Sequence, residues 1–189
     1  MSRVVTPTPR HRRSAAAVLL LGTLTVSTAG AAPEDDYQRG LAAFRSDDVI
    51  VALSSLRRAA DQGHAAAQAL LAYLLDRAEE NTAALDFYRR AAEQGNADGM
   101  YGMAMLLALG EGTEKNPQEA VRWLERGSEL GHGPSMTALA EALIGGDLGL
   151  TPDVARARTL LEKALAGGHG PARAVLQRIG AAPAKGGTS

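Results

Sequence analysis

Three histidines recur at one position of a repeated pattern, and together they could form a metal site. His64, His132 and His169 each follow a glycine directly, and Asn96 occupies the fourth equivalent position. Zinc needs its ligand nitrogens about 2 Å away. Equivalent positions in stacked helices are at least ~8–10 Å apart. We therefore expect these histidines to bond local backbone in turns, and we expect no metal site.

The other side chains that could do chemistry form no recognisable catalytic set. The chain has no cysteine, which excludes disulfides, thiolate metal sites and a cysteine nucleophile. Gly110-Glu111-Gly112 has neither a preceding strand pattern nor a following Gly-Lys-Ser/Thr, so it is not expected to bind phosphate. Paired acids lie near expected helix ends, which is typical of solvated caps. These pairs are Asp35-Asp36, Asp47-Asp48 and Glu79-Glu80. We expect no catalytic residue and no cofactor.

The composition narrows the class of protein. The chain has 189 residues, with 20 basic against 21 acidic side chains, and so lacks the basic excess that binding to nucleic acid requires. Hydrophobic residues make up 46%, which excludes a wholly disordered chain. Ala, Leu, Gly, Arg and Glu dominate, and this composition favours helices.

The elements that must position any site come from an internal repeat. Its anchoring glycines are Gly63, Gly95, Gly131 and Gly168, spaced by 32, 36 and 37 residues. Counted from each glycine, positions −11, −7 and −4 are small, large and small, which is one face of a helix. In order along the chain, these positions hold Ala52, Ala84, Ala120, Ala157; Leu56, Tyr88, Leu124, Leu161; and Ala59, Ala91, Gly127, Ala164.

A second helix pattern follows each glycine. Position +4 is always small, and positions +8 and +11 are apolar. Each period therefore predicts two helices, with a left-handed glycine ending the second helix of the pair. Pro134 and Pro171 lie where first helices should begin. Asn116-Pro117 and Thr151-Pro152 predict an N-cap followed by proline at the first position of second helices.

The stretch from Gly99 to Gly131 resembles the Sel-1-like repeat family. The spacing matches throughout, although Ala104 replaces the family glycine and Leu107 the family tyrosine. The resemblance implies an all-α, right-handed α-solenoid of about four helix-turn-helix repeats, related to tetratricopeptide repeats, over residues 32–180. Residues 171–180 would form a terminal capping helix, and residues 181–189 a disordered tail.

The first 31 residues have the order of a cleavable signal peptide. Four arginines and no acid precede an apolar stretch from Ala15 to Val26, and the small residues Ala29-Gly30-Ala31 follow. The apolar stretch is short of the ~20 residues that span a membrane. We expect cleavage before Ala32 and secretion, to the bacterial periplasm, by the general or the twin-arginine route. The mature chain then has 16 basic and 21 acidic residues, a net charge of about −5.

The tyrosines predict a binding surface. Tyr88 is at seam position −7 and is expected in the core, whereas Tyr73 and Tyr101 fall where related tetratricopeptide arrays line a concave face. The alternative is that these rings only pack between neighbouring first helices. The predicted partner-binding residues are Tyr37, Tyr73, Arg77, Asp98, Tyr101, Met105 and Glu141.

These observations favour a monomeric, exported scaffold or regulator that holds a protein or peptide in its concave groove, without nucleic acid or stable membrane insertion. One alternative is a structural part of a cell-envelope assembly that docks through the outer helices. Another is a hydrolase of the β-lactamase kind attributed to some Cys-rich relatives. The lack of cysteine and of a nucleophile–base pair argues against that alternative, and we expect no enzyme.

Overall fold

The computed structural model describes residues 32–181, which form nine α-helices, a short 3-10 helix and no strand. The helices are α1 (Pro33–Arg45), α2 (Val49–Asp61), α3 (Ala65–Arg77), α4 (Asn81–Glu93), α5 (Ala97–Leu109), α6 (Pro117–Glu129), α7 (Gly133–Gly145), η1 (Asp147–Gly149), α8 (Val154–Ala166) and α9 (Ala172–Ala181). The predicted signal peptide, residues 1–31, lies outside the described residues. So does the predicted tail, apart from Ala181, which ends α9.

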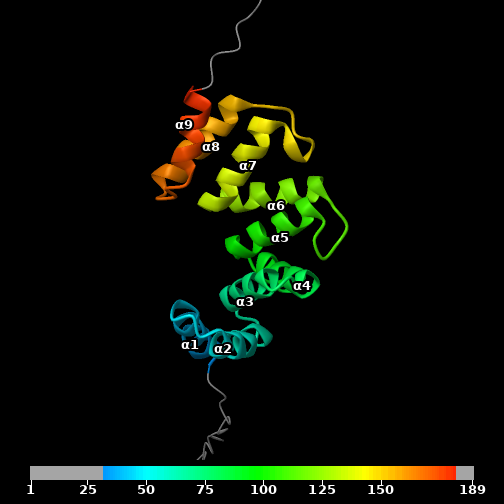
Figure 1. Cartoon of the computed structure of the whole chain (residues 1–189), viewed down its shortest axis with the longest axis vertical. Coiled ribbons are helices and arrows are strands. Elements are labelled where there is room, and N and C mark those ends of the chain that lie inside the picture. Colours follow the sequence, from blue (N-terminus) through cyan, green and yellow to red (C-terminus); the bar gives the residue numbers. More distant parts are fainter. Residues whose placement is uncertain (1–31, 182–189) are drawn as a thin grey trace, which may run out of the picture. The chain divides into compact units, whose positions relative to one another are not determined.

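The helices form a repeat array. Each helix packs against the next one along the chain, as Figure 1 shows. The first helices of the repeats (α1, α3, α5, α7 and α9) also contact one another in succession. The predicted all-α repeat fold is confirmed. Its first helices α1, α3, α5 and α7 each cover positions +2 to +14 of the repeat, so equivalent residues lie at equivalent places.

The turn glycines have the predicted left-handed conformation. Their φ values are +88° at Gly63, +84° at Gly95, +80° at Gly131 and +89° at Gly168. At the first of these turns the amides of Gly63 and His64 donate to carbonyl oxygens of α2, at 3.0 Å each. The last carbonyl groups of the helix are thus satisfied, and the chain reverses into the next first helix.

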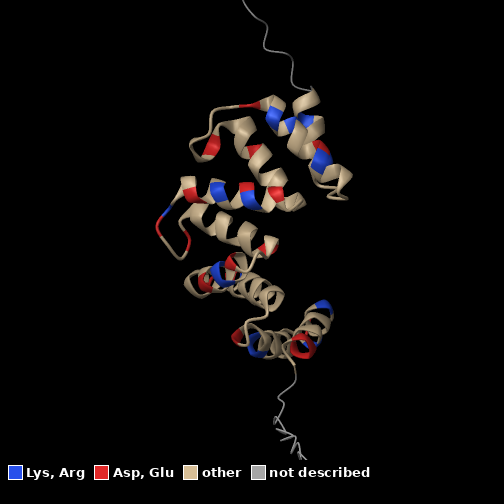
Figure 2. Cartoon of the chain, turned by 180° about the vertical axis from the view of Figure 1, so that it is seen from behind, with Lys and Arg blue, Asp and Glu red and all other residues tan. Residues whose placement is uncertain are grey.

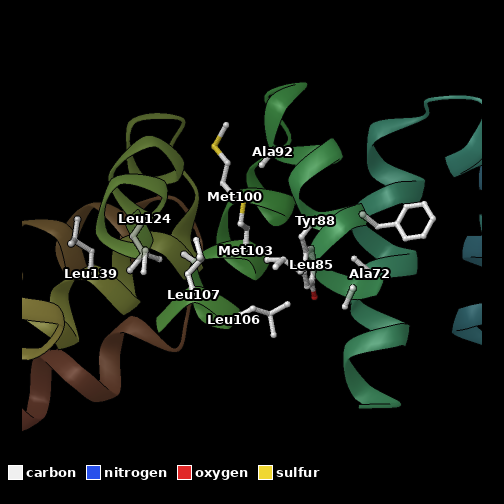
Figure 3. Close-up of a cluster of buried hydrophobic side chains, with 14 of the residues drawn as sticks. Ala72, Leu85, Tyr88, Ala92, Met100, Met103, Leu106, Leu107, Leu124 and Leu139 are labelled. Atoms are coloured by element: carbon white, nitrogen blue, oxygen red, sulfur yellow. The ribbon is translucent and has the colours of Figure 1, made fainter. Parts of the chain in front are cut away.

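The core is the predicted seam of small and large side chains. The four alanines at position −11 are fully buried, and the large residues at −7 are almost as deeply buried. In Figure 3, Leu85 and Tyr88 of α4 lie between the helix that carries Ala72 and the one that carries Met103. Small residues at −4 and +4 allow these helices to approach closely, and the large residue fills the space between them.

One predicted helix start is wrong, and another is confirmed. Asn116 caps α6, because its side chain accepts the Glu119 amide at 3.1 Å. Thr151, however, does not cap α8. Asp153 takes that role by accepting the Arg156 amide at 2.9 Å, and Pro152 precedes the helix. The amide of Asp153 also donates to the Leu143 carbonyl at 2.9 Å, which holds this residue at the helix start.

Asp36 is not the solvated acid that its place near a helix start suggested. Its side chain is only 2% exposed, and its Oδ1 accepts from Nη2 of Arg58 at 2.8 Å and from Nε at 3.1 Å. The hydrogen bond from Arg58 lowers the pKa of the Asp36 carboxyl. The pair joins α1 to α2, across 22 residues of sequence.

The turn histidine of the first junction bonds local backbone, as expected. Nδ1 of His64 accepts the Ala67 amide at 3.1 Å and so caps α3, as Asn96 caps α5 through the Gly99 amide. Because Nδ1 is an acceptor, the ring proton is on Nε2, which donates to Glu34 of α1 at 2.8 Å. Hydrogen bonds from Gln38 and then His64 lower the pKa of Glu34.

Substitution of His64 should separate its two roles. His64→Ala loses the cap and is expected to lower the free energy of unfolding by about 1 kcal/mol. His64→Asn should keep most of that stability, because Asn96 already makes this cap in the same fold. Both variants should raise the pKa of Glu34, measured by NMR titration. Equal losses of stability in the two variants would contradict the capping role.

The junction between α4 and α5 shows a compensation of side-chain size. Seam position −7 is leucine in the other repeats, but here it is Tyr88. A Cβ atom on Gly102 would collide with the Tyr88 ring. The position equivalent to Gly102 is Ala138 where the seam residue is Leu124. At this junction Tyr88 and Gly102 therefore take the places that Leu124 and Ala138 occupy at the junction of α6 and α7.

This pair predicts a specific double-mutant result. Gly102→Ala should lower the free energy of unfolding by about 1–3 kcal/mol through overpacking. Adding Tyr88→Leu should recover most of the loss, because the double variant reproduces the Leu124–Ala138 pair. Gly180→Ala is the control, since nothing lies within 4 Å of that Cβ position. Urea unfolding followed by circular dichroism measures all three, and additive losses would refute the compensation.

Candidate functional site

An open groove of about 660 Å³ crosses the first helices α1, α3, α5 and α7. Its lining residues include Tyr37 and Leu41 of α1; Ala66, Ala69, Leu70, Tyr73 and Asp76 of α3; Tyr88 of α4; Asp98, Tyr101, Gly102, Met105, Leu106 and Leu109 of α5; Glu111; His132; and Pro134 of α7. Most of them occupy repeat positions +3, +6, +10 and +13. Those spacings place side chains on one face of a helix, so repetition builds a continuous surface.

The structure brings five of the seven predicted binding residues together in this groove. Tyr37, Tyr73, Asp98, Tyr101 and Met105 all line it. The other two lie outside the lining. Arg77 places its guanidinium carbon 5.9 Å from the Tyr73 ring centroid, and Glu141 accepts from Nη2 of Arg178 at 3.1 Å. Glu141 is thus already paired with α9.

The groove tyrosines also contact neighbouring repeats, so the two alternatives for their role are compatible. Tyr73 is 41% exposed and meets Phe44 of α1 edge-on at 6.1 Å. Tyr101 meets the His132 ring edge-on at 5.9 Å. Burial and then the charge of Glu141 raise the pKa of Tyr101. Each ring is therefore held in place by packing on one side while it lines the groove.

Twelve of the 17 lining residues escaped the sequence-based prediction, and four of them bear on the chemistry of the groove. They are Asp76, Tyr88, Leu109 and Glu111. Asp76 had a detectable signal, because it occupies a repeat position that is otherwise apolar. Tyr88 was correctly placed in the core, at 5% exposure, but its longer side chain also reaches the groove. Glu111 belongs to a loop motif that gives no signal for this groove.

The groove carries negative charge without a neutralising base. Asp76, Asp98 and Glu111 line it, and no Lys or Arg does. Helices α5 and α7 contain no basic residue, whereas acids and bases mix along second helices such as α6 (Figure 2). Burial and then the charge of Glu111 raise the pKa of Asp76. The hydrogen bond from His132 instead lowers the pKa of Asp98.

Three side chains at the edge of the groove are connected in the order of a hydrolytic triad, but their role is structural. They are Ser135, His132 and Asp98. Nδ1 of His132 lies 2.8 Å from the Ser135 hydroxyl, and Nε2 lies 3.1 Å from Asp98 Oδ1. Ser135 is 0% exposed, behind Gly127, where a Cβ atom would collide with the hydroxyl. A substrate cannot reach that oxygen. His132 caps α7 and bridges to α5, as His64 does between α3 and α1.

Within residues 32–181, no group of three His, Asp or Glu side chains lies close enough to hold a metal ion. Nor is any helix in that part of the chain long and apolar enough to cross a membrane. The aromatic rings, apolar side chains and carboxylates of the groove are groups suited to noncovalent recognition.

Comparison with solved structures finds two similar repeat proteins. A Sel1 repeat protein from Oxalobacter formigenes has a TM-score of 0.72 and 27% identity, over 78% of this chain and 61% of that one. A protective antigen present in uropathogenic Escherichia coli strains, which displays an SLR fold, has a TM-score of 0.70 and 25% identity. That match covers 78% of this chain and 33% of the antigen. This chain thus spans less than two thirds of both proteins.

A search of curated proteins finds no match. The model of the Sel1 repeat, in contrast, matches four consecutive segments, residues 37–64, 65–96, 97–132 and 133–169. Their boundaries coincide with the turns that end at His64, Asn96, His132 and His169, so the family unit is the helix pair seen in the structure. The chain belongs to the Sel1 repeat family.

Proposed function

We propose that this protein is an exported interaction scaffold that holds a segment of a partner protein in the groove over α1, α3, α5 and α7. Sel1-repeat proteins generally mediate protein–protein interaction. The observation that carries the proposal is the groove itself. It spans several repeats and combines tyrosine rings, exposed apolar side chains and carboxylates.

The repeat architecture suits this role physically. The first helices carry the groove on one face and are fixed by packing against their second helices. Binding therefore needs little ordering of the scaffold, which reduces the entropic cost of association. Tyr73, Tyr101 and Met105 supply large contact area, and tyrosine and methionine are enriched at protein interfaces.

Export to the periplasm is part of the proposal and is supported by the N-terminal sequence. A basic start, an apolar stretch and small residues before Ala32 form the order that signal peptidases recognise. Ala32 directly precedes α1, so cleavage there would leave every helix of the array intact.

Photo-crosslinking in intact cells tests the groove. A photoreactive residue at Leu109, which is 59% exposed and lines the groove, should capture a partner. One at Ile50, which is 83% exposed on α2, should not. Tyr73→Ala combined with Tyr101→Ala should reduce the yield at Leu109 by about ten-fold, because two aromatic contacts are lost. Helical content, measured by circular dichroism, should remain.

Crosslinks from Ile50 alone would contradict the groove proposal. They would favour the alternative, a structural component of an envelope assembly that docks through its second helices. An undiminished yield at Leu109 in the double variant would also contradict the role of the two tyrosines.

Export predicts a defined mature protein. Protein recovered from the periplasmic fraction should begin at Ala32, as measured by N-terminal sequencing or intact mass. Replacing Ala29 and Ala31 with glutamine should leave the precursor uncut, because the peptidase accepts only small residues at these positions. A mature protein that still begins at Met1 would refute processing at this site.

A further inference from the structure

Several residues that depart from the repeat pattern of this chain lie in the groove. Position +13 is apolar in the other first helices, at Phe44, Ala108 and Ile144, but it is Asp76 in α3. Position +14 is arginine in α1 and α3 but Leu109 in α5. Tyr88 and Gly102 depart at the seam, as described above. Asp76 and Leu109 are not seam residues, so these two departures indicate a role other than packing.

Asp76 is held where its charge is disfavoured. It is half-buried in the last turn of α3, where the negative end of the helix dipole opposes an anion. It lies near Glu111, and neither carboxylate makes an ion pair or side-chain hydrogen bond with another described residue. Burial and Glu111 raise the pKa of Asp76. A bound cation would offset the unfavourable helix dipole and the repulsion from Glu111.

Tyr88 gives an independent indication of a ligand. Its side chain is 5% exposed and lines the groove, but its hydroxyl makes no hydrogen bond with any other described residue. Burial, followed by the charge of Asp76, raises the pKa of this phenol, so the group is a neutral donor and acceptor. Because this hydroxyl opens onto the groove, it is free to bond a ligand there.

An organic cation with a planar charge fits these surroundings. The structure already pairs guanidinium groups with rings. Arg57 and Arg90 lie 5.1 and 4.9 Å from the Phe87 centroid, and Arg126 lies 4.7 Å from that of Trp123. Tyrosine rings beside two free carboxylates offer a guanidinium both stacking and charge-assisted hydrogen bonds, which an ammonium group uses less well.

We propose that the groove recognises a peptide segment of its partner through an arginine side chain, which is placed among Tyr73, Tyr88 and Tyr101 and pairs with Asp76 and Glu111. The inference rests on the proposed scaffold function and names the chemistry of its partner. The groove extends well beyond this cluster, over Leu41, Leu70 and Leu109. Apolar residues flanking the arginine therefore complete the match to a peptide rather than to a small cation.

A peptide selection followed by a double-mutant cycle tests the proposal. Random dodecapeptides displayed on phage are selected on the full chain, and the tightest binder is synthesised with a fluorescent label. We expect it to contain arginine beside apolar residues. Replacing that arginine with citrulline, which is neutral and of the same shape, should weaken binding by about ten-fold or more.

The same comparison is made on Asp76→Asn combined with Glu111→Gln. In this variant the arginine and citrulline peptides should bind within about two-fold of each other, because the paired charges are gone. The control is Glu93→Gln combined with Glu162→Gln, which removes two exposed carboxylates outside the groove lining. It should retain the preference for arginine. Asp76→Asn should also raise the midpoint of thermal unfolding, which excludes misfolding as the cause of lost binding.

The outcomes separate this inference from the scaffold proposal. One outcome is a peptide that depends on Tyr73 and Tyr101 and yet binds equally tightly with arginine or with citrulline. That result would overturn the arginine site and leave the scaffold function standing. An equal loss of preference in the control variant would also overturn it, since net charge alone would explain the effect. If no peptide binds, or binding is indifferent to Tyr73→Ala with Tyr101→Ala, both proposals fail.

Discussion

The close approach of helices at the repeat seam is the constraint on which the rest of the structure depends. A Cβ atom on Gly99 would lie 2.6 Å from that of Ala91, and the alanines at position −11 are fully buried. Only small residues permit neighbouring helices to approach this closely, and the close approach fixes the register of each helix on the next. Because the register repeats, positions +3, +6, +10 and +13 of every first helix meet on one face. The groove is the consequence of that repetition.

The polar groups at the junctions serve the same register. His64 and His132 cap their own helices through Nδ1 and bridge to an acid of the previous first helix through Nε2. Asn96, in contrast, follows a first helix with Ala66 at the position equivalent to Asp98, and it makes only the cap. His64 and His132 thus bridge where the preceding first helix supplies an acidic acceptor, whereas the position equivalent to Asp98 before His169 is Pro134. The contact between the His132 ring and the buried hydroxyl of Ser135 is therefore part of a structural link between helices.

Much of the fold was predictable because its signals are local or periodic. The four turn glycines, the seam residues and the cap at Asn116 follow from spacing and from the conformational freedom of glycine. The predictions were wrong where residues far away in the sequence determine a cap or the burial of a side chain. The N-cap of α8 is Asp153, whose amide donates to the Leu143 carbonyl, and not the predicted Thr151. Asp36 is buried because it pairs with Arg58, 22 residues away. Neither contact has a periodic signature, so neither could be found by counting along the chain.

The sequence by itself determined the helix pairs, their turns and the face on which tyrosines gather, because those depend on residue size and on a period of 3.6 residues. Only the tertiary structure decided which charges share the groove. In the folded chain Asp76 lies near Glu111 of a different repeat, and Glu141 pairs with Arg178 outside the groove lining. Tyr88 reaches the groove because Gly102 has no side chain. The physical reason is that burial and pairing of a charge depend on neighbours from other helices, whose positions are set by packing across the seam.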